Sequence, residues 1–154
     1  MNEISSRDIR LKAMDLLARR EHLRSELEIK LNKRFGPDLE DIGAVLDQLE
    51  QDQLLSDQRF TEAYVRYRSG RGYGPARIQQ DLRQKGADAE LITEALAGCE
   101  TDWAKLAREV RHKKFGVEIP ADFKEKSRQL RFLQYRGFGG ELSSLAFLEM
   151  EADS

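Results

Sequence analysis

Cysteine, proline and long apolar runs are scarce in this sequence, and each scarcity narrows what the chain can be. The one cysteine, Cys99, excludes an internal disulfide and suits a reducing compartment. Its place at the end of an apolar run predicts a buried thiol. No apolar stretch reaches the roughly 20 residues that a membrane-spanning helix needs, and the opening stretch MNEISSRDIR holds no apolar signal-peptide core. We therefore expect a cytoplasmic protein.

With 3 prolines, 35% charged residues and a mean hydropathy of -0.66, the chain has a helical composition and material for only a thin core. Apolar residues recur with the helical period of about 3.6, and no stretch alternates as a strand would. The sequence therefore predicts an all-α fold of about nine helices. The expected helices are 6–19, 22–34, 38–52, 56–69, 75–85, 88–98, 101–114, 122–136 and 139–150.

The apolar stripes of these helices predict which side chains face the interior. The third helix has the clearest stripe. In the fourth helix the expected inward residues include an aromatic pair, and in the seventh they flank a tryptophan. The inward residues named for these three helices are Leu39, Ile42, Leu46, Leu49, Phe60, Ala63, Tyr64, Tyr67, Trp103, Leu106, Ala107 and Val110.

The nine helices group into threes, which predicts three units at residues 1–54, 55–99 and 100–154. Units of this length match helical repeats, in which each unit stacks on its neighbours and no single large core forms. Identity between the units is weak. We interpret them as three divergent copies of one three-helix repeat.

Charge is distributed in blocks although the net charge is only -2. All 26 lysines and arginines lie in 1–36, 59–86 and 103–136, so each unit would have two basic helices and one acidic helix. If the units stack in parallel, the basic helices form a continuous track. Such a track is typical of a protein that binds a polyanion such as nucleic acid. The alternative is that these cations only solvate their helices.

Local spacing indicates where this track is strongest. Four residues of the eighth helix fall at i, i+4, i+7 and i+11, which places three cations and an aromatic ring on one face. Such a face suits a single strand, because cations pair with phosphates and bases stack on rings. The candidate residues of the eighth helix are Lys124, Arg128, Arg131 and Tyr135, and those of the seventh are Lys105 and Arg108, with His112 beside them.

The stretch SGRGYGPARIQQDLRQKG holds the remaining candidates. Its glycines fit neither the dinucleotide fingerprint nor a P-loop, because no strand precedes them and the spacing is wrong. Gly74 as an N-cap, Pro75 at the first helical position and Gly86 as a left-handed C-cap explain them better. They do not explain the arginines around the turn, Arg66, Arg68, Arg71 and Arg77, which we take as binding residues, although Asp81 could pair locally with Arg77.

No catalytic or metal-binding constellation is visible. The two histidines, His22 and His112, lie far apart in basic helices, and no CxxC, GxSxG or HxxEH-like pattern occurs. We expect a protein that is not an enzyme and needs no cofactor.

Three motifs resemble the RecX family, the regulators of the bacterial recombinase RecA. They are LSDQRFTEAYVRYR at Leu55–Arg68, GYGPARIQQDLRQKG at Gly72–Gly86 and RFLQYRGF at Arg131–Phe138. A weaker fourth, ARREHLRSEL, has Leu23 where the family usually has serine. The motifs follow the family's order and spacing over nearly the whole chain.

This resemblance implies an elongated, curved solenoid of three three-helix repeats that inserts into the groove of the RecA filament on single-stranded DNA. There it would inhibit or modulate ATP hydrolysis, strand exchange and the coprotease role of the filament, and so tune DNA repair and the SOS response. We expect a monomer. Its expected partners are the filament and single-stranded DNA, and the expectation extends to double-stranded DNA. Two alternatives stay open: a stand-alone helix-turn-helix DNA-binding module, and a helical adaptor without nucleic acid.

Overall fold

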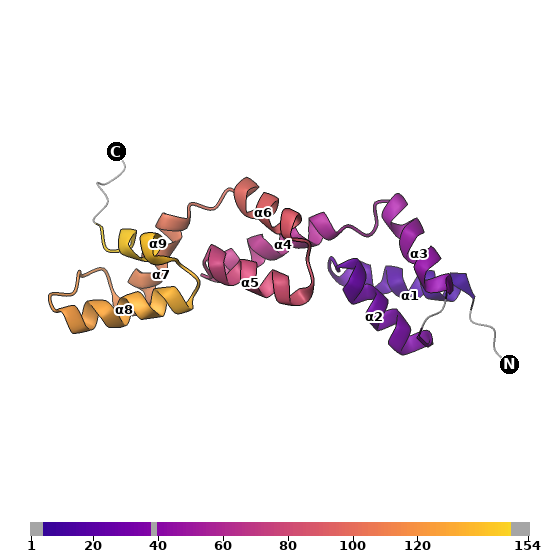
Figure 1. Ribbon diagram of the computed structural model, residues 1–154, viewed down its shortest axis with the longest axis horizontal. Helices are drawn as coiled ribbons and strands as arrows, with labels where there is room; N and C mark the ends of the chain where they lie inside the picture. The colour runs from indigo at the N-terminus through magenta and orange to yellow at the C-terminus, as the bar shows by residue number, and fades with distance from the viewer. Residues whose placement is uncertain (1–4, 38–39, 149–154) are drawn as a thin grey trace.

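The fold consists of short helices arranged in a row. The computed structural model describes residues 5–37 and 40–148, and every regular element within these ranges is an α-helix. Figure 1 shows an elongated molecule in which three groups of helices follow one another from the N-terminus to the C-terminus. The all-α helical-repeat prediction is confirmed. The helices are α1 (Ser6–Arg19), α2 (Arg24–Phe35), α3 (Glu40–Gln51), α4 (Asp57–Gly70), α5 (Pro75–Lys85), α6 (Ala89–Gly98), α7 (Trp103–Phe115), α8 (Phe123–Tyr135) and α9 (Gly140–Leu145).

Local capping explains where most of these helices begin. In five of them a serine or aspartate at the N-cap accepts a hydrogen bond from a backbone N–H of the first turn. Each such cap contributes on the order of 1 kcal/mol, which matters in a chain that cannot rely on one large core. The capping residues are Ser5, Ser56, Asp88, Asp102 and Asp122.

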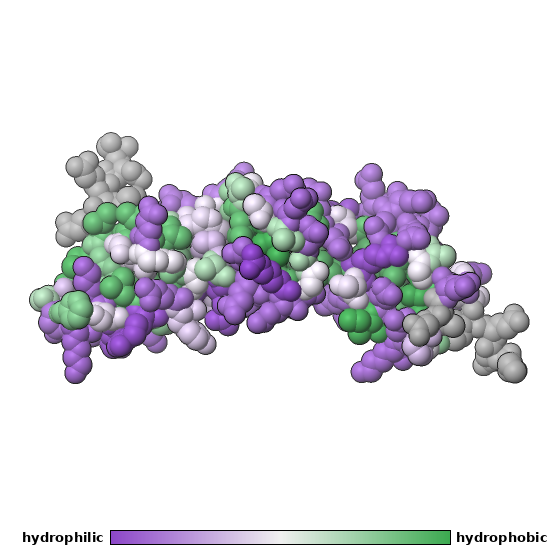
Figure 2. Space-filling view, in the orientation of Figure 1, coloured by the Kyte–Doolittle hydropathy of each residue, from purple (hydrophilic) through white to green (hydrophobic). Residues whose placement is uncertain are grey.

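Three separate apolar clusters hold the molecule together, one for each group of helices. We call α1–α3 the first module, α4–α6 the second and α7–α9 the third. The hydrophobic surface also appears as separate patches over the three modules in Figure 2, with hydrophilic side chains around them. Representative buried residues are Ile9, Leu31 and Leu46 in the first cluster, Phe60, Ile78 and Ile92 in the second, and Ala107, Leu133 and Phe138 in the third.

Side chains connect the first module to the second. Leu23 precedes α2 but is buried in the second cluster. The backbone N–H of Arg24 donates to Asp57 Oδ1 at 2.7 Å, and Arg59 Nε donates to Glu21 Oε1 at 3.0 Å. We call this contact the first junction. Leu23 lies on one side of the predicted boundary between residues 54 and 55 and packs on the other side. This boundary between the first two units therefore remains a prediction.

The buried face of α4 differs from the expected one. Phe60 is buried, but Tyr67 is 57% exposed, and Thr61, Val65 and Ser69 are buried instead. α4 packs against both α5 and α6, so its buried face is wider than a single apolar stripe. The hydroxyls of Thr61 and Ser69 donate to carbonyls of their own helix, and this satisfies them although they are buried.

The third module contains a buried cation that the sequence does not reveal. Arg111 is 1% exposed, whereas the expected inward residues Trp103, Leu106 and Val110 are only partly buried. The Arg111 guanidinium donates to five oxygens, and burial lowers its pKa. Its acceptors are the backbone oxygens of Gly116, Val117, Glu118 and Ala146 and the side-chain Oε1 of Gln129.

Two further expectations need correction. The last helix ends at Leu145, because Phe147 and Leu148 donate to carbonyls three residues back and form tight turns. Its expected end at 150 lies outside the described residues, as does Leu39. Cys99 is half-buried rather than buried, and its Sγ donates to the carbonyl of Leu96.

None of the described helices combines the length and the apolar character that a membrane crossing requires.

Candidate nucleic-acid interface

The turn between α4 and α5 lies directly against the loop that follows α8. Gly74 N–H donates to the carbonyl of Arg136 at 2.8 Å, and Ala76 N–H donates to the carbonyl of Gly137 at 3.1 Å. Pro75 has no N–H to satisfy, and Gly74 has no side chain to cap the helix. The third module therefore accepts the free backbone donors at the start of α5.

Glycine is required on both sides of this contact. A Cβ on Gly74 would overlap the carbonyl of Gly137, and a Cβ on Gly137 would lie 2.6 Å from the backbone nitrogen of Arg77. Gly137 also has a φ of +102°, which L side chains rarely adopt. We call this contact, between 71–77 and 135–138, the seam. Its glycines serve the close approach of two backbones.

Three arginines at or beside the seam surround one aromatic ring. The guanidinium carbons of Arg68, Arg136 and Arg77 lie 3.8, 4.9 and 5.6 Å from the centroid of the Tyr73 ring. Arg68 and Arg77 also share one carboxylate, because Asp81 lies 3.6 Å from the first and 3.4 Å from the second. These two predicted binding residues are thus partly neutralised, and Asp81 is the local partner that the sequence suggested for Arg77.

Four cations at or beside the seam line a groove of about 580 Å³. Arg136 Nη1 donates to the carbonyl of Arg71, and Lys113 and Lys114 approach from the last turn of α7. No ion pair joins these four side chains to a described carboxylate, although Glu109 lines the same groove. We call this the cationic groove. Sequence reasoning missed three of its cations, Lys113, Lys114 and Arg136.

The predicted face of α8 is exposed to solvent, as expected, but one of its cations, Arg128, is neutralised by an ion pair. Lys124, Arg128, Arg131 and Tyr135 are all exposed. Arg128 donates from two nitrogens to the carboxylate of Glu125, and this hydrogen bonding lowers the pKa of Glu125 to about 2. Lys124 and Arg131 have no ion pair with a described carboxylate.

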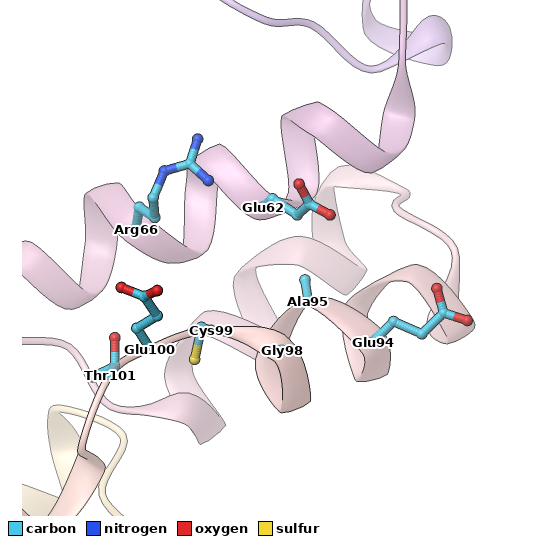
Figure 3. A pocket seen from close by; sticks show the side chains of 8 residues that line it. All are labelled: Glu62, Arg66, Glu94, Ala95, Gly98, Cys99, Glu100 and Thr101. Carbon is cyan, nitrogen blue, oxygen red and sulfur yellow. The ribbon is translucent and has the colours of Figure 1, made fainter.

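The remaining candidates lie apart from the seam. Lys105 is exposed on α7, and Arg108 is half-buried, with its Nε lacking an acceptor in the described part of the chain. Arg66 lines another groove, of about 680 Å³. Figure 3 shows α4 carrying Arg66 and Glu62 along one wall, opposite Glu94 of α6 and Glu100 of the next linker. This acidic surrounding does not suit a polyanion.

Metal ligation finds no support in residues 5–37 and 40–148, where no three His, Cys, Asp or Glu side chains gather closely enough to hold an ion. His22 is buried between the carbonyl of Arg20 and the ammonium of Lys30. His112 is half-buried on α7.

Comparison with known proteins assigns the chain to a family. Residues 56–96 match the second three-helix domain of RecX, and residues 100–147 match its third three-helix domain. Regulatory protein RecX of Pseudomonas entomophila is 48% identical over 87% of this chain and 86% of its own length. The chain belongs to the RecX family. Regulatory protein RecX of Halorhodospira halophila is also 48% identical, over 87% of this chain and 83% of its own length.

Solved RecX structures share the fold. The crystal structure of RecX from Lactobacillus salivarius superposes with a TM-score of 0.77 at 20% identity, covering 92% of this chain and 93% of the other. Another structure, of regulatory protein RecX, gives 0.72 at 24% identity over 94% of this chain. At the seam, two of the motifs that indicated the RecX family, GYGPARIQQDLRQKG and RFLQYRGF, contact each other.

Proposed function

We propose that this chain binds the RecA filament on single-stranded DNA and inhibits its ATPase, strand exchange and coprotease activities, without catalysis of its own. Its relatives are named regulatory proteins. Such a protein would tune DNA repair and the SOS response. The observation that carries the proposal is the cationic groove at the seam.

The cationic groove suits a phosphate backbone because none of its four cations forms an ion pair with a carboxylate in residues 5–37 and 40–148. Arg71, Lys113, Lys114 and Arg136 converge on one hollow, whereas many cations elsewhere face a carboxylate within 4.0 Å. Phosphates release condensed counterions when cations replace them, and this favours binding even to a protein with a small net charge. The interface we propose comprises Arg71, Lys105, Arg108, Lys124, Arg131 and Tyr135, with the addition of Lys113, Lys114 and Arg136. The other candidates from the sequence lie beside carboxylates and remain predictions; they are Arg66, Arg68, Arg77 and Arg128.

The test removes two lysines that play no part in the seam's hydrogen bonds. Lys113→Ala with Lys114→Ala should weaken binding to the filament and restore part of the recombinase ATPase. Each lost phosphate contact should also reduce the log–log salt slope by about 0.7. Lys33→Ala, which removes one exposed charge from α2 of the first module, serves as the control. Parent-like binding and inhibition by the double variant at every salt concentration would refute the groove's role.

A stand-alone helix-turn-helix module is the alternative, and the short Gly-containing turn between α4 and α5 has the length of such a motif. In that motif the first turn of the second helix enters the DNA groove. Here the start of α5 is covered by the third module through Gly74 and Ala76. Co-sedimentation with the filament, compared with binding to free duplex DNA, separates the two functions.

A further inference from the structure

A second groove lies beside the seam, between α5 and the end of α8, with a volume of about 400 Å³. Polar but largely uncharged side chains dominate it, in contrast to the cationic groove. We call it the amide groove. The side chains that matter here are Arg77, Gln80, Asp81, Gln84, Gln134 and Tyr135.

The two charged side chains of the amide groove, Arg77 and Asp81, lie against each other. Arg77 Nε pairs with Asp81 Oδ1 at 3.4 Å, and Asp81 also accepts from the Tyr64 hydroxyl. The Asp81 side chain is only 18% exposed and is shared with Arg68, so it is not free to hold a further cation, and it partly neutralises Arg77. A neutral ligand therefore fits this groove better than a phosphate does.

Three side-chain amides are available to such a ligand. Gln80, Gln84 and Gln134 are exposed, and none of their amides forms a hydrogen bond with a described residue. Gln80 and Gln84 lie one turn apart on α5, so they share a face, and Gln134 faces them from α8. Each amide offers a carbonyl acceptor and two N–H donors.

An aromatic ring completes the groove. Tyr135 is 70% exposed. Arg77 forms a cation–π contact with its ring, with the guanidinium carbon 5.4 Å from the ring centroid. Arg77 Nη1 also donates to the Tyr135 backbone carbonyl at 3.4 Å. A supported, open ring beside free amides is the combination that binds unstacked bases, through stacking and through hydrogen bonds to their edges.

We propose that the amide groove is a nucleobase subsite, in which one base of a single strand stacks on Tyr135 and hydrogen-bonds to the glutamines. The inference rests on the proposed function, since it requires a bound single strand. Arg136 lines the cationic groove and lies in the chain between Tyr135 and Gly137, which line the amide groove. A strand crossing the seam would thus place phosphates on one side and a base on the other.

Adenine is the base that this chemistry favours. Its N6 donor and N7 acceptor are adjacent, and a glutamine amide pairs with both at once. Thymine offers an acceptor and a methyl group on the corresponding edge, so in a single strand it pairs with a glutamine amide only through its Watson–Crick edge, whereas adenine can use either edge. The subsite should therefore distinguish oligo(dA) from oligo(dT) of the same length.

The first experiment measures the stacking contribution. Fluorescence anisotropy with oligo(dA) and with an abasic oligonucleotide of equal length compares strands that carry the same phosphates. Tyr135→Ala should weaken binding to oligo(dA) about tenfold, in the range of one lost stacking contact, and leave the abasic strand unaffected. Tyr135→Phe keeps the ring and should bind like the parent. Equal losses on both strands would overturn the subsite.

The second experiment measures recognition of the base edge. Gln80→Ala combined with Gln134→Ala should abolish the preference for oligo(dA) over oligo(dT), with an unchanged salt slope. Gln79→Ala on the same helix lies outside the groove and should keep the preference. No preference in the parent, or a preference that survives the double variant, would overturn the proposal.

The two hypotheses fail in different ways. If neither the abasic strand nor the filament binds the parent, the proposed function is wrong and the subsite falls with it. If both bind and base-bearing strands bind no more tightly than abasic ones, only the nucleobase subsite is wrong.

Discussion

The two junctions between the modules are built by different means. At the first junction, side chains make the contact: Leu23 enters the second cluster, and Glu21 pairs with Arg59. At the seam, backbone meets backbone through Gly74 and Gly137. Side chains adjust to substitutions and respond to salt and pH, whereas two backbones in contact leave no room for adjustment. The seam should therefore be the more rigid junction and the one less tolerant of mutation.

The largest expected effect is at the seam. Gly137→Ala combines a left-handed φ with a clash against Arg77, so we expect a loss of about 4 kcal/mol in the free energy of unfolding. Urea unfolding measures it, and hydrogen exchange at Gly74 and Ala76 should accelerate. Gly43→Ala is the control, because open space surrounds Gly43 within α3 and alanine there should stabilise by about 0.5–1 kcal/mol. Unchanged stability of Gly137→Ala would contradict the backbone contact.

A smaller loss is expected at the first junction. Leu23→Ala removes a side chain that is 1% exposed and should cost about 3 kcal/mol through lost burial and the cavity it leaves. Although Leu23 belongs to the first module, amides around Phe60 and Val65 of the second should exchange faster. Leu54→Ala, at an exposed leucine of the linker between α3 and α4, should cost only about 0.5 kcal/mol. If protection were lost only in the first module, Leu23 would not join the two.

Acid should destabilise the protein by less than the Leu23→Ala substitution does, through His22, which precedes Leu23 in the chain. Burial is the main cause that lowers the pKa of His22, and the positive charges of Arg20 and Lys30 add to it, although the Arg20 carbonyl and Glu26 oppose the shift. The unfolded chain then binds a proton more readily than the folded one, so stability is complete above about pH 6.5 and falls as the pH drops below it.

The pH effect is measured as the difference in stability between the parent and His22→Gln across this window. The pKa of His112 is lowered too, mainly by burial, so both proteins are compared in a His112→Gln background. Parallel profiles would show that His22 does not carry the pH dependence.

The smallest effect concerns the ion pair at the first junction. Glu21 and Arg59 are 34% and 41% exposed, and solvent screens such pairs, so the coupling energy should be about 0.5 kcal/mol. A double-mutant cycle with Glu21→Gln and Arg59→Gln measures it. The coupling should shrink further at high salt. A coupling as large as the Leu23 effect would mean that charge, rather than burial, maintains this junction.

Predictions from the sequence were correct where interactions between residues close together in the chain determine the structure. The helical period of the apolar residues identified the helices, the Gly74 and Gly86 caps were predicted correctly, and the motifs indicated the RecX family. It failed where a helix faces two neighbours, as α4 does with Tyr67 outside and Ser69 inside. An apolar stripe read from the sequence assumes that the helix packs against one neighbour, whereas α4 packs against both α5 and α6.

Charge was the least predictable property of the candidate site. Counting cations could not distinguish Arg128, which is held by Glu125, from Lys113, which has no described ion pair and lines the cationic groove. Nor could it show that Arg111 is buried among carbonyls. Pairing depends on which carboxylate lies within a few ångströms, and that is set by packing between helices.

The amino-acid sequence by itself determined the helices, their caps, their grouping in threes and the family, because these depend on residues close together in the chain. Only the tertiary structure decided that Gly74 and Gly137 meet, and that Arg71, Lys113, Lys114 and Arg136 share one groove. These contacts join segments far apart in sequence. Their existence depends on how whole modules dock, and no local pattern of residues specifies that.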